Sequence, residues 1–254
     1  MDDVIANIAN GKCDKIGGGA FKEIYKIGDK AYATEIIRSK NATALYDRLK
    51  SISDRVSKHV LIPDNYVERN GIRYWEMDFC EADLNREDGN TADILQTFSI
   101  DELQQNFDEL EETVDELHAA GITLMDIKPD NMLFMCGADR NIQLTDLDGS
   151  LIDGKGEPHQ TMYYTFLKFQ EDYVKQDKFA LIASFLDILD SQVWVYRPMQ
   201  WFRSMKDWTD DARARLDDTP RSKLAAAYLD KLDALEKIEG IAHASVSSIF
   251  ELKL

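Results

Sequence analysis

The sequence has no apolar run that approaches the roughly 18 residues needed to cross a bilayer as a helix. Its first residues, Met1–Ala6, also lack the basic flank and the apolar stretch of a secretory signal peptide. From these two absences we expect a cytoplasmic protein that has no membrane partner.

Cysteine and positive charge are both scarce. The three cysteines, Cys13, Cys80 and Cys136, lie far apart without the pair spacing of a metal site, so we expect reduced, apolar side chains. The net charge of −17 argues against nucleic acid as a partner, and against an acidic membrane surface. A polyanionic ligand would therefore have to be neutralised locally, by a metal ion and a few well-placed cations.

The composition that remains is typical of a globular protein. Of the 254 residues 44% are hydrophobic, which is enough to form the core of one two-lobed domain or of two small ones.

The segment 15–36 contains a run of three glycines, and apolar and polar residues alternate after it. This pattern predicts a strand, a glycine turn and a hairpin that reverses at Gly28. The run, Gly17, Gly18 and Gly19, would let backbone N–H groups approach phosphate oxygens closely.

Hydrophobic periodicity predicts the remaining elements. We expect helices over residues 41–58, 99–120, 179–189 and 222–239, and strands that begin at Val60 and Gly71. Ser99 and Glu102 have the spacing of a capping box, and Gly121 is placed to end that helix with a left-handed cap. The chain therefore changes from a β-rich N-terminal part to an α-rich C-terminal part.

Four polar residues with apolar neighbours form the most informative pattern of the sequence. Asp126, Lys128 and Asn131 lie in the segment 123–131, and Asp146 follows in the segment 144–148. ATP-dependent phosphoryl transfer uses these types in this order: an acid near the nucleophilic hydroxyl, a lysine near the moving phosphate, and Asn and Asp for Mg²⁺. The pattern predicts a phosphoryl-transfer site that uses ATP and Mg²⁺.

On these segments the chain resembles the protein kinase-like superfamily, over roughly residues 15–190 and most closely at 121–149. The resemblance implies an α+β, two-lobed fold. A small antiparallel β N-lobe with one helix would span residues 1–79, and a larger α-helical C-lobe would span residues 80–254. The same likeness favours Ser/Thr hydroxyls of a protein substrate as the acceptor.

The resemblance also implies a role for each polar residue. Asp126 would orient or deprotonate the acceptor hydroxyl, and Lys128 would steady the γ-phosphate. Asn131 and Asp146 would bind Mg²⁺, and the extra carboxylate of Asp148 could join them.

A second set of implied roles concerns the nucleotide and the loop that carries Asp126. Residues 77–80 resemble the hinge between the lobes, where the backbone of Asp78 and Cys80 would pair with adenine and Met77 would be the gatekeeper. Asp177 resembles the aspartate that braces the backbone of the catalytic loop.

The lysine usually found on the third strand is missing, because residues 31–36 offer only Thr34 or Glu35 there. Lys22 stands where a third glycine is usual, which resembles the with-no-lysine kinases. From that position it could reach the same phosphates, since adjacent strands lie about 4.8 Å apart. The helix at 41–58 contains no Glu to orient this lysine. Asp47, and then Asp54, is the best candidate partner there, but the favoured interpretation of both is a solvent-facing helix charge.

Other departures from the family pattern concern regulation and the acceptor. Leu124 and Met125 replace the usual His-Arg pair, so we expect activity that does not depend on phosphorylation of the activation loop. The segment 149–176 lacks the Ala-Pro-Glu motif, which leaves the acceptor open, and Thr161 is expected to face it.

Three functional hypotheses follow. The pattern Asp-x-Lys-Pro-x-Asn favours a Ser/Thr protein kinase, which is our leading expectation. The pair Asp146 and Asp148 also fits small-molecule kinases that resemble aminoglycoside or choline phosphotransferases, and an acidic protein suits a cationic substrate. The third is a pseudokinase that binds nucleotide without transfer, in which Lys22 is only an exposed hairpin lysine. The oligomeric state stays open.

Overall fold

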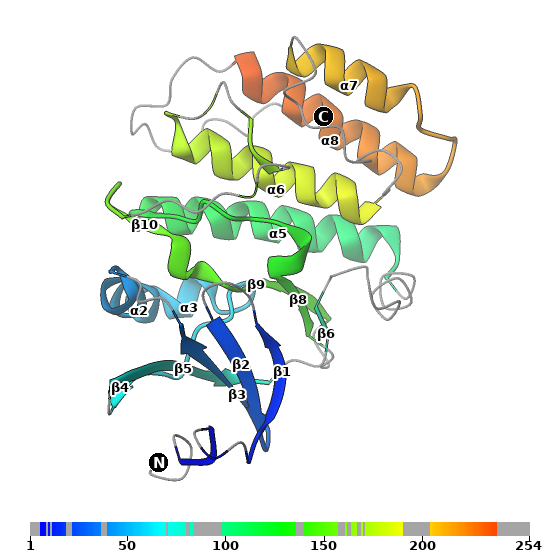
Figure 1. Ribbon diagram of the computed structural model, residues 1–254. Helices are drawn as coiled ribbons and strands as arrows, with labels where there is room; N and C mark the ends of the chain where they lie inside the picture. The colour runs from blue at the N-terminus through cyan, green and yellow to red at the C-terminus, as the bar shows by residue number, and fades with distance from the viewer. Residues whose placement is uncertain are drawn as a thin grey trace.

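We describe the protein from a computed structural model. The structure describes residues 12–18, 22–36, 40–69, 71–79, 98–135, 140–156, 171–189 and 204–237, together with residues 6–8, 10, 82–83, 161, 164–166 and 169. It is a mixed α+β structure that contains a five-stranded antiparallel sheet and several helices (Figure 1). The finer expectation of two kinase-like lobes, divided at residue 79, stays a prediction.

The antiparallel sheet is built from the first third of the chain. Gly28, with φ of 64°, makes the predicted hairpin turn. Because side chains alternate along a strand, Ala33 and Trp75 enter the main core while Tyr32 and Tyr74 form a small cluster on the other face. The strands, in the spatial order β1-β2-β3-β5-β4, are β1 (Asp14–Gly18), β2 (Lys22–Ile27), β3 (Lys30–Glu35), β4 (Asn65–Arg69) and β5 (Ile72–Asp78).

The prediction of one continuous helix over residues 41–58 is wrong. The chain forms α2 (Ala42–Ser51) and α3 (Ser53–Val56), separated at Ile52, whose φ is −121°. Ser51 and Ser53 donate side-chain hydrogen bonds to preceding backbone carbonyls, and such bonds compete with a regular helix. The expected apolar stripe is nevertheless fully buried: Leu45, Leu49, Ile52 and Val56.

The strand expected to begin at Val60 is also not formed. Val60 makes a single parallel bridge with Leu144, and β4 begins only at Asn65. Pro63, which has no N–H to donate, interrupts any ladder between them.

Four long helices form the other part of the described structure (Figure 1). The predicted capping box at Ser99 is confirmed, since the Ser99 side chain accepts from Glu102 N–H and Glu102 returns a bond to Ser99 N–H. Phe107 stacks on Phe185 with ring centroids 3.9 Å apart and meets Tyr228 edge-on, so α5, α6 and α8 share one core. The helices are α5 (Ile100–Ala119), α6 (Tyr173–Leu189), α7 (Met205–Arg213) and α8 (Pro220–Lys237).

The helix expected at 179–189 is confirmed as buried but begins earlier, at Tyr173. The helix expected at 222–239 is α8, and residues 238–239 lie outside the described part of the chain. None of the helices in the described ranges combines the length and the apolar character that a membrane crossing requires.

Short elements lie between the sheet and the long helices (Figure 1). Those that follow α5 in the chain bring the predicted polar residues Asp126, Lys128, Asn131, Asp146 and Asp148 into this middle layer. A three-stranded sheet is formed by β6 (Ala82–Asp83), β8 (Met132–Met135) and β9 (Asn141–Leu144). A two-stranded sheet pairs β7 (Ile122–Thr123) with β10 (Leu151–Ile152). Two short 3-10 turns are η1 (Pro129–Asn131) and η2 (Leu147–Gly149).

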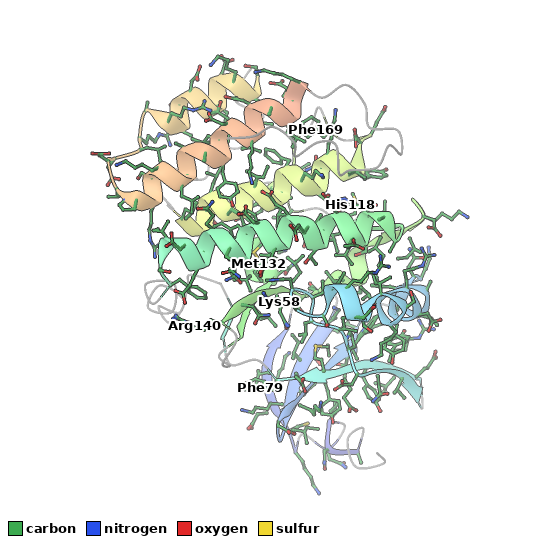
Figure 2. The ribbon with its side chains drawn as sticks, turned by 180° about the vertical axis from the view of Figure 1, so that it is seen from behind. Lys58, Phe79, His118, Met132, Arg140 and Phe169 are labelled. Carbon is green, nitrogen blue, oxygen red and sulfur yellow. The ribbon has the colours of Figure 1, made fainter. Side chains whose placement is uncertain are left out.

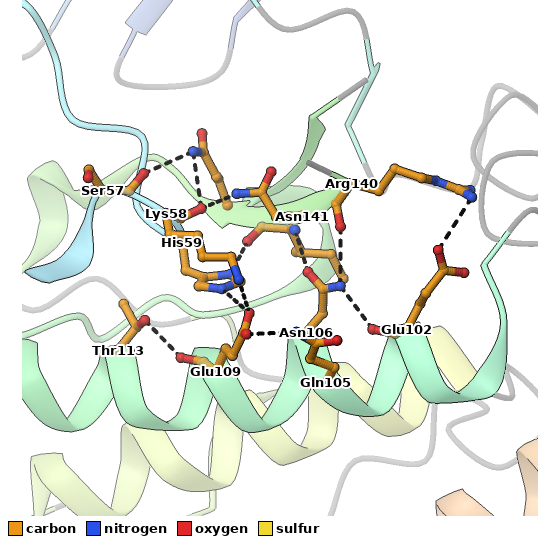
Figure 3. Close-up of polar contacts among 12 residues, drawn as sticks. Ser57, Lys58, His59, Glu102, Gln105, Asn106, Glu109, Thr113, Arg140 and Asn141 are labelled. Atoms are coloured by element: carbon orange, nitrogen blue, oxygen red, sulfur yellow. Dashed lines mark hydrogen bonds and ion pairs between the residues drawn. The ribbon is translucent and has the colours of Figure 1, made fainter. Parts of the chain in front are cut away.

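A polar network fastens the segment 57–60 and β9 to helix α5 (Figure 3). The ring of His59 has Nδ1 2.9 Å from the Ile142 carbonyl oxygen and Nε2 2.8 Å from Glu109 Oε2. Lys58 Nζ lies 2.6 Å from the same Glu109 oxygen, and Asn106 Oδ1 accepts from the Ile142 N–H at 2.9 Å. The layer that carries the predicted site is thus held to α5 by polar bonds as well as by packing.

The pKa of Glu109 makes this network sensitive to acid. Partial burial raises that pKa, but hydrogen bonds from Lys58, Gln105 and His59 outweigh burial and lower it to about 2. A lowered carboxylate pKa contributes stability that is present above the unfolded value of 4.5 and is lost as the pH falls toward 2.

We expect Glu109→Gln to lower the free energy of unfolding by about 2 kcal/mol at pH 7, after allowance for solvent screening, and by clearly less at pH 3.5. Urea denaturation at both pH values measures the two differences. The exposed Glu112→Gln on the same helix is the control, with an expected effect within about 0.5 kcal/mol at either pH. An equal loss for Glu109→Gln at both pH values would contradict the electrostatic account.

Candidate functional site

The first group of predicted residues is brought together by the turn between β7 and β8. Lys128 Nζ lies 2.8 Å from Asp126 Oδ2. Asn131 Nδ2 donates to the Asp126 backbone carbonyl at 2.8 Å and lies 3.3 Å from its Oδ2. The side chains of Asp126 and Lys128 are each 19% exposed, so the acid and the lysine are sheltered but reachable.

Thr161 comes from the segment after β10 and meets this group. Its hydroxyl donates to Asp126 Oδ1 at 2.6 Å, and its backbone N–H donates to the same oxygen at 2.9 Å. Lys128 Nζ donates to the Thr161 hydroxyl oxygen at 3.0 Å. The Thr161 hydroxyl thus donates a hydrogen bond to the Asp126 carboxylate and accepts one from the Lys128 ammonium. Thr161 therefore lies beside Asp126 and Lys128, and the expectation that it faces an acceptor stays a prediction.

Asp177 of α6 holds the loop that carries Asp126. Its side chain is fully buried, and its two oxygens accept the backbone N–H groups of Leu124 and Met125, each at 2.7 Å. Met125 has φ of 71°, a left-handed conformation that costs a non-glycine residue about 1 kcal/mol. The two hydrogen bonds offset that cost, so the loop keeps a shape that places Asp126 toward Lys128.

Sequence reasoning missed His118, which lies toward the end of α5 (Figure 2). Its Nε2 lies 2.9 Å from Asp177 Oδ2 and donates the third hydrogen bond to this buried carboxylate. The contact depends on how α6 packs against α5, and the spacing of residues in the sequence does not indicate that packing.

The second group of predicted residues gathers around Lys22. Its Nζ forms ion pairs with Asp146 and with Asp148 Oδ1, the latter at 2.5 Å. Asp146 has φ of 58° and starts the turn η2, which lets both carboxylates face one side. The neighbouring Thr145 N–H donates to the Asn131 carbonyl at 2.9 Å, so the second group lies directly beside the first.

The charges in this group determine each other's pKa. Burial lowers the pKa of Lys22, but Asp148 and then Asp146 outweigh it, so the pKa is raised and the ammonium keeps its charge. Burial raises the pKa of Asp148, and Asp146 adds to the rise against the opposing effect of Lys22. Burial also acts on Asp146, but Lys22 outweighs it and the pKa is lowered, with a contribution from Lys128. The charge of Lys128 in the first group thus affects the pKa of Asp146 in the second group.

The carboxylate pair fits a hard cation. Asp146 and Asp148 converge on a single ammonium, which shows that both can reach the same positive charge. Proteins commonly hold Mg²⁺ by one or two carboxylates, with substrate phosphates and waters as the other ligands. In the described part of the chain no group of three or more His, Cys, Asp or Glu residues could hold a metal ion. A metal at this pair would therefore draw further ligands from Asn131, phosphate and water.

Asp47 on α2 and Asp54 on α3 are exposed to solvent, as the favoured interpretation of these two acids predicted. Lys22 reaches instead from β2 to Asp146 and Asp148. The sequence did not indicate this pairing, because the turn η2 lies more than a hundred residues after Lys22.

The predicted glycine turn and hinge are described only in part. A Cβ atom at Gly18 would lie 2.9 Å from the Lys22 carbonyl oxygen, so the close approach of β1 to β2 requires glycine. Gly17 pairs with β2 beside it, and Gly19 lies outside the described residues. At the hinge, Met77 packs against the main core. Asp78 is exposed and pairs with Lys30, and Cys80 lies outside the described residues.

No protein-family model matches the chain, and a search of curated proteins found no match. The function must therefore be argued from the two adjacent groups of residues.

We expect Asp177→Asn to lower the free energy of unfolding by about 2–3 kcal/mol, because an amide NH₂ would face a buried N–H donor and the charged acceptor is lost. The amides of Leu124 and Met125 should lose their protection from hydrogen exchange in the same variant. Urea denaturation and exchange measured by NMR test both points. Asp101→Asn, exposed on α5, should change neither quantity. Unchanged protection in Asp177→Asn would refute the proposed bracing role.

Proposed function

We propose that this protein is an ATP- and Mg²⁺-dependent kinase that transfers phosphate to Ser/Thr hydroxyls of protein substrates. In this proposal the chain has a two-lobed, protein kinase-like fold, with a nucleotide-binding N-lobe at residues 1–79 and a catalytic C-lobe at residues 80–254. The observation that carries the proposal is the placement of the Thr161 hydroxyl between Asp126 and Lys128, next to a carboxylate pair that holds the Lys22 ammonium.

The residues divide the chemistry between them. Asp126 orients the acceptor hydroxyl and takes its proton during transfer; in the structure its Oδ1 accepts a hydrogen bond from the Thr161 hydroxyl. Lys128 neutralises charge on the transferred phosphate. Asn131, Asp146 and Asp148 would hold Mg²⁺, which when bound neutralises the phosphates and orients them. Lys22 supplies the second cation from β2.

Contacts around the segment after η2 support activity without phosphorylation of that segment. Arg48 of α2 pairs with Asp153 at 3.1 Å, and its guanidinium also donates to the Ala120 carbonyl. Asn41 Nδ2 donates to the Lys155 carbonyl at 2.7 Å. These bonds connect α2 to the segment 151–155 with no need for an added phosphate group.

A small-molecule kinase is the second candidate. It is favoured by Asp148, whose side chain is only 13% exposed and faces the same cation as Asp146. Two metal-directed carboxylates in this spacing resemble the aminoglycoside and choline phosphotransferases, and the net charge of −17 would attract a cationic acceptor.

We expect Asp126→Asn to reduce phosphate transfer from γ-labelled ATP by at least about 100-fold, because the proton acceptor is lost. Lys22→Met should also abolish measurable transfer, through loss of the cation that faces the phosphates. The assay uses Mg²⁺ and either the protein itself or a generic basic protein as the acceptor. Lys15→Met, exposed on β1, is the matched control and should retain transfer.

Other results would redirect the proposal. Loss in Asp126→Asn alone would keep the kinase and exclude the role of Lys22. Turnover with cationic small molecules but not with proteins would favour the second candidate. If no acceptor is phosphorylated and ATP only raises the melting temperature, the chain is a nucleotide-binding pseudokinase.

A further inference from the structure

Lys22 occupies the place that a metal ion would take. Its Nζ is bound between Asp146 and Asp148, and its side chain is only 14% exposed. An ammonium and a divalent cation cannot share this pair closely, because like charges about 4 Å apart repel each other strongly when partly desolvated. Binding of Mg²⁺ to the two carboxylates therefore requires Lys22 to move to another partner.

One acid lies directly opposite Lys22. In the antiparallel pairing of β2 with β3, the Cα partner of Lys22 is Glu35. Side chains of directly opposed residues lie on the same face of the sheet, with Cβ atoms about 4.5–5.5 Å apart. This is the face on which Ala33 and Trp75 enter the main core, the face toward the candidate site.

Glu35 has an oxygen available for such a partner. Its Oε1 accepts from the Tyr66 hydroxyl at 3.3 Å, whereas its Oε2 is buried and has no hydrogen-bond partner in the described structure. Burial, and then the charge of Glu35, raise the pKa of Tyr66 to about 12, so Tyr66 stays a neutral donor. A buried carboxylate oxygen without a donor is unfavourable, and an approaching ammonium would relieve that.

In the described part of the chain, Arg73 on β5 is a second cation near Glu35. Its Nε pairs with Glu68 at 2.9 Å, and Glu35 contributes to the raised pKa of Arg73. Among the described residues Glu35 Oε2 has no hydrogen-bond partner, so no hydrogen bond joins it to Arg73. Arg73 therefore interacts electrostatically with Glu35 but does not hydrogen-bond Oε2, so this oxygen could accept a bond from Lys22.

We propose that Glu35 is the positioning residue for Lys22 once the metal is bound. Nζ of Lys22 leaves Asp146 and Asp148 and pairs with Glu35 Oε2, which keeps the ammonium directed at the phosphates. The acid that orients Lys22 thus comes from the neighbouring strand β3. The acids of helices α2 and α3 are exposed to solvent and do not take this role. This inference deepens the proposed function and depends on it for the nucleotide readout.

The first experiment compares binding of a fluorescent ATP analogue in the presence of Mg²⁺. Glu35→Gln, which keeps the shape and an acceptor for Tyr66, should weaken binding about 5- to 10-fold. The same substitution in the Lys22→Met background should change binding less than about 2-fold, because Glu35 acts through Lys22. Tyr66→Phe, which leaves the carboxylate in place, is the control and should stay within about 2-fold. An equal loss in both backgrounds, or no loss in either, overturns the inference.

A second experiment needs no nucleotide and so separates this inference from the proposed function. In the double variant Asp146→Asn, Asp148→Asn the carboxylates no longer hold Lys22, so it should pair with Glu35. Adding Glu35→Gln should then lower the melting temperature by at least about 2 °C more than it does in the unaltered chain. If the melting temperatures show this coupling between Glu35 and the two carboxylates but the protein binds no ATP, the relocation of Lys22 stands and the kinase proposal is refuted. Absence of coupling overturns the relocation, whatever the binding experiment shows.

Discussion

Asp177 lies fully buried in α6 and accepts hydrogen bonds from Leu124 N–H, Met125 N–H and His118. A buried carboxylate is costly unless such donors surround it, so the three bonds oblige α5, α6 and the loop to keep one mutual arrangement. That arrangement sets the left-handed Met125 and, one residue later, the direction of Asp126. The positions of Lys128, Asn131 and Thr161 follow from Asp126, and Asn131 fixes Thr145 and the carboxylate pair next to it.

Electrostatics give this middle layer its second constraint. The chain carries a net charge of −17, so the field of the whole molecule opposes an anionic ligand. Among the described residues, Lys22 and Lys128 are cations that lie among the candidate carboxylates, and each is already paired with acid oxygens. In the proposed kinase, phosphate and Mg²⁺ together would replace these internal pairs. In this proposal one set of ion pairs would be exchanged for another, and Glu35 would receive the lysine that is released.

Predictions from local sequence succeeded where a short segment decides its own structure. The capping box at Ser99, the turn at Gly28 and the grouping of Asp126, Lys128 and Asn131 depend on neighbours a few residues away. Predictions failed where distant segments decide. The partner of Lys22 is a turn more than a hundred residues later, and the role of His118 arises only because α6 packs on α5. The spacing of residues within one helix does not predict such contacts between distant segments.

The most direct measurement is a crystal structure of the protein with a non-hydrolysable ATP analogue and Mn²⁺, whose anomalous scattering locates the metal. The account predicts Mn²⁺ held by Asp146 and Asp148 with Asn131 nearby, and the terminal phosphate beside Asp126 and Lys128. It also predicts Lys22 displaced from the carboxylates toward Glu35. A metal bound elsewhere, or a nucleotide that leaves Lys22 on Asp146 and Asp148, would contradict the account.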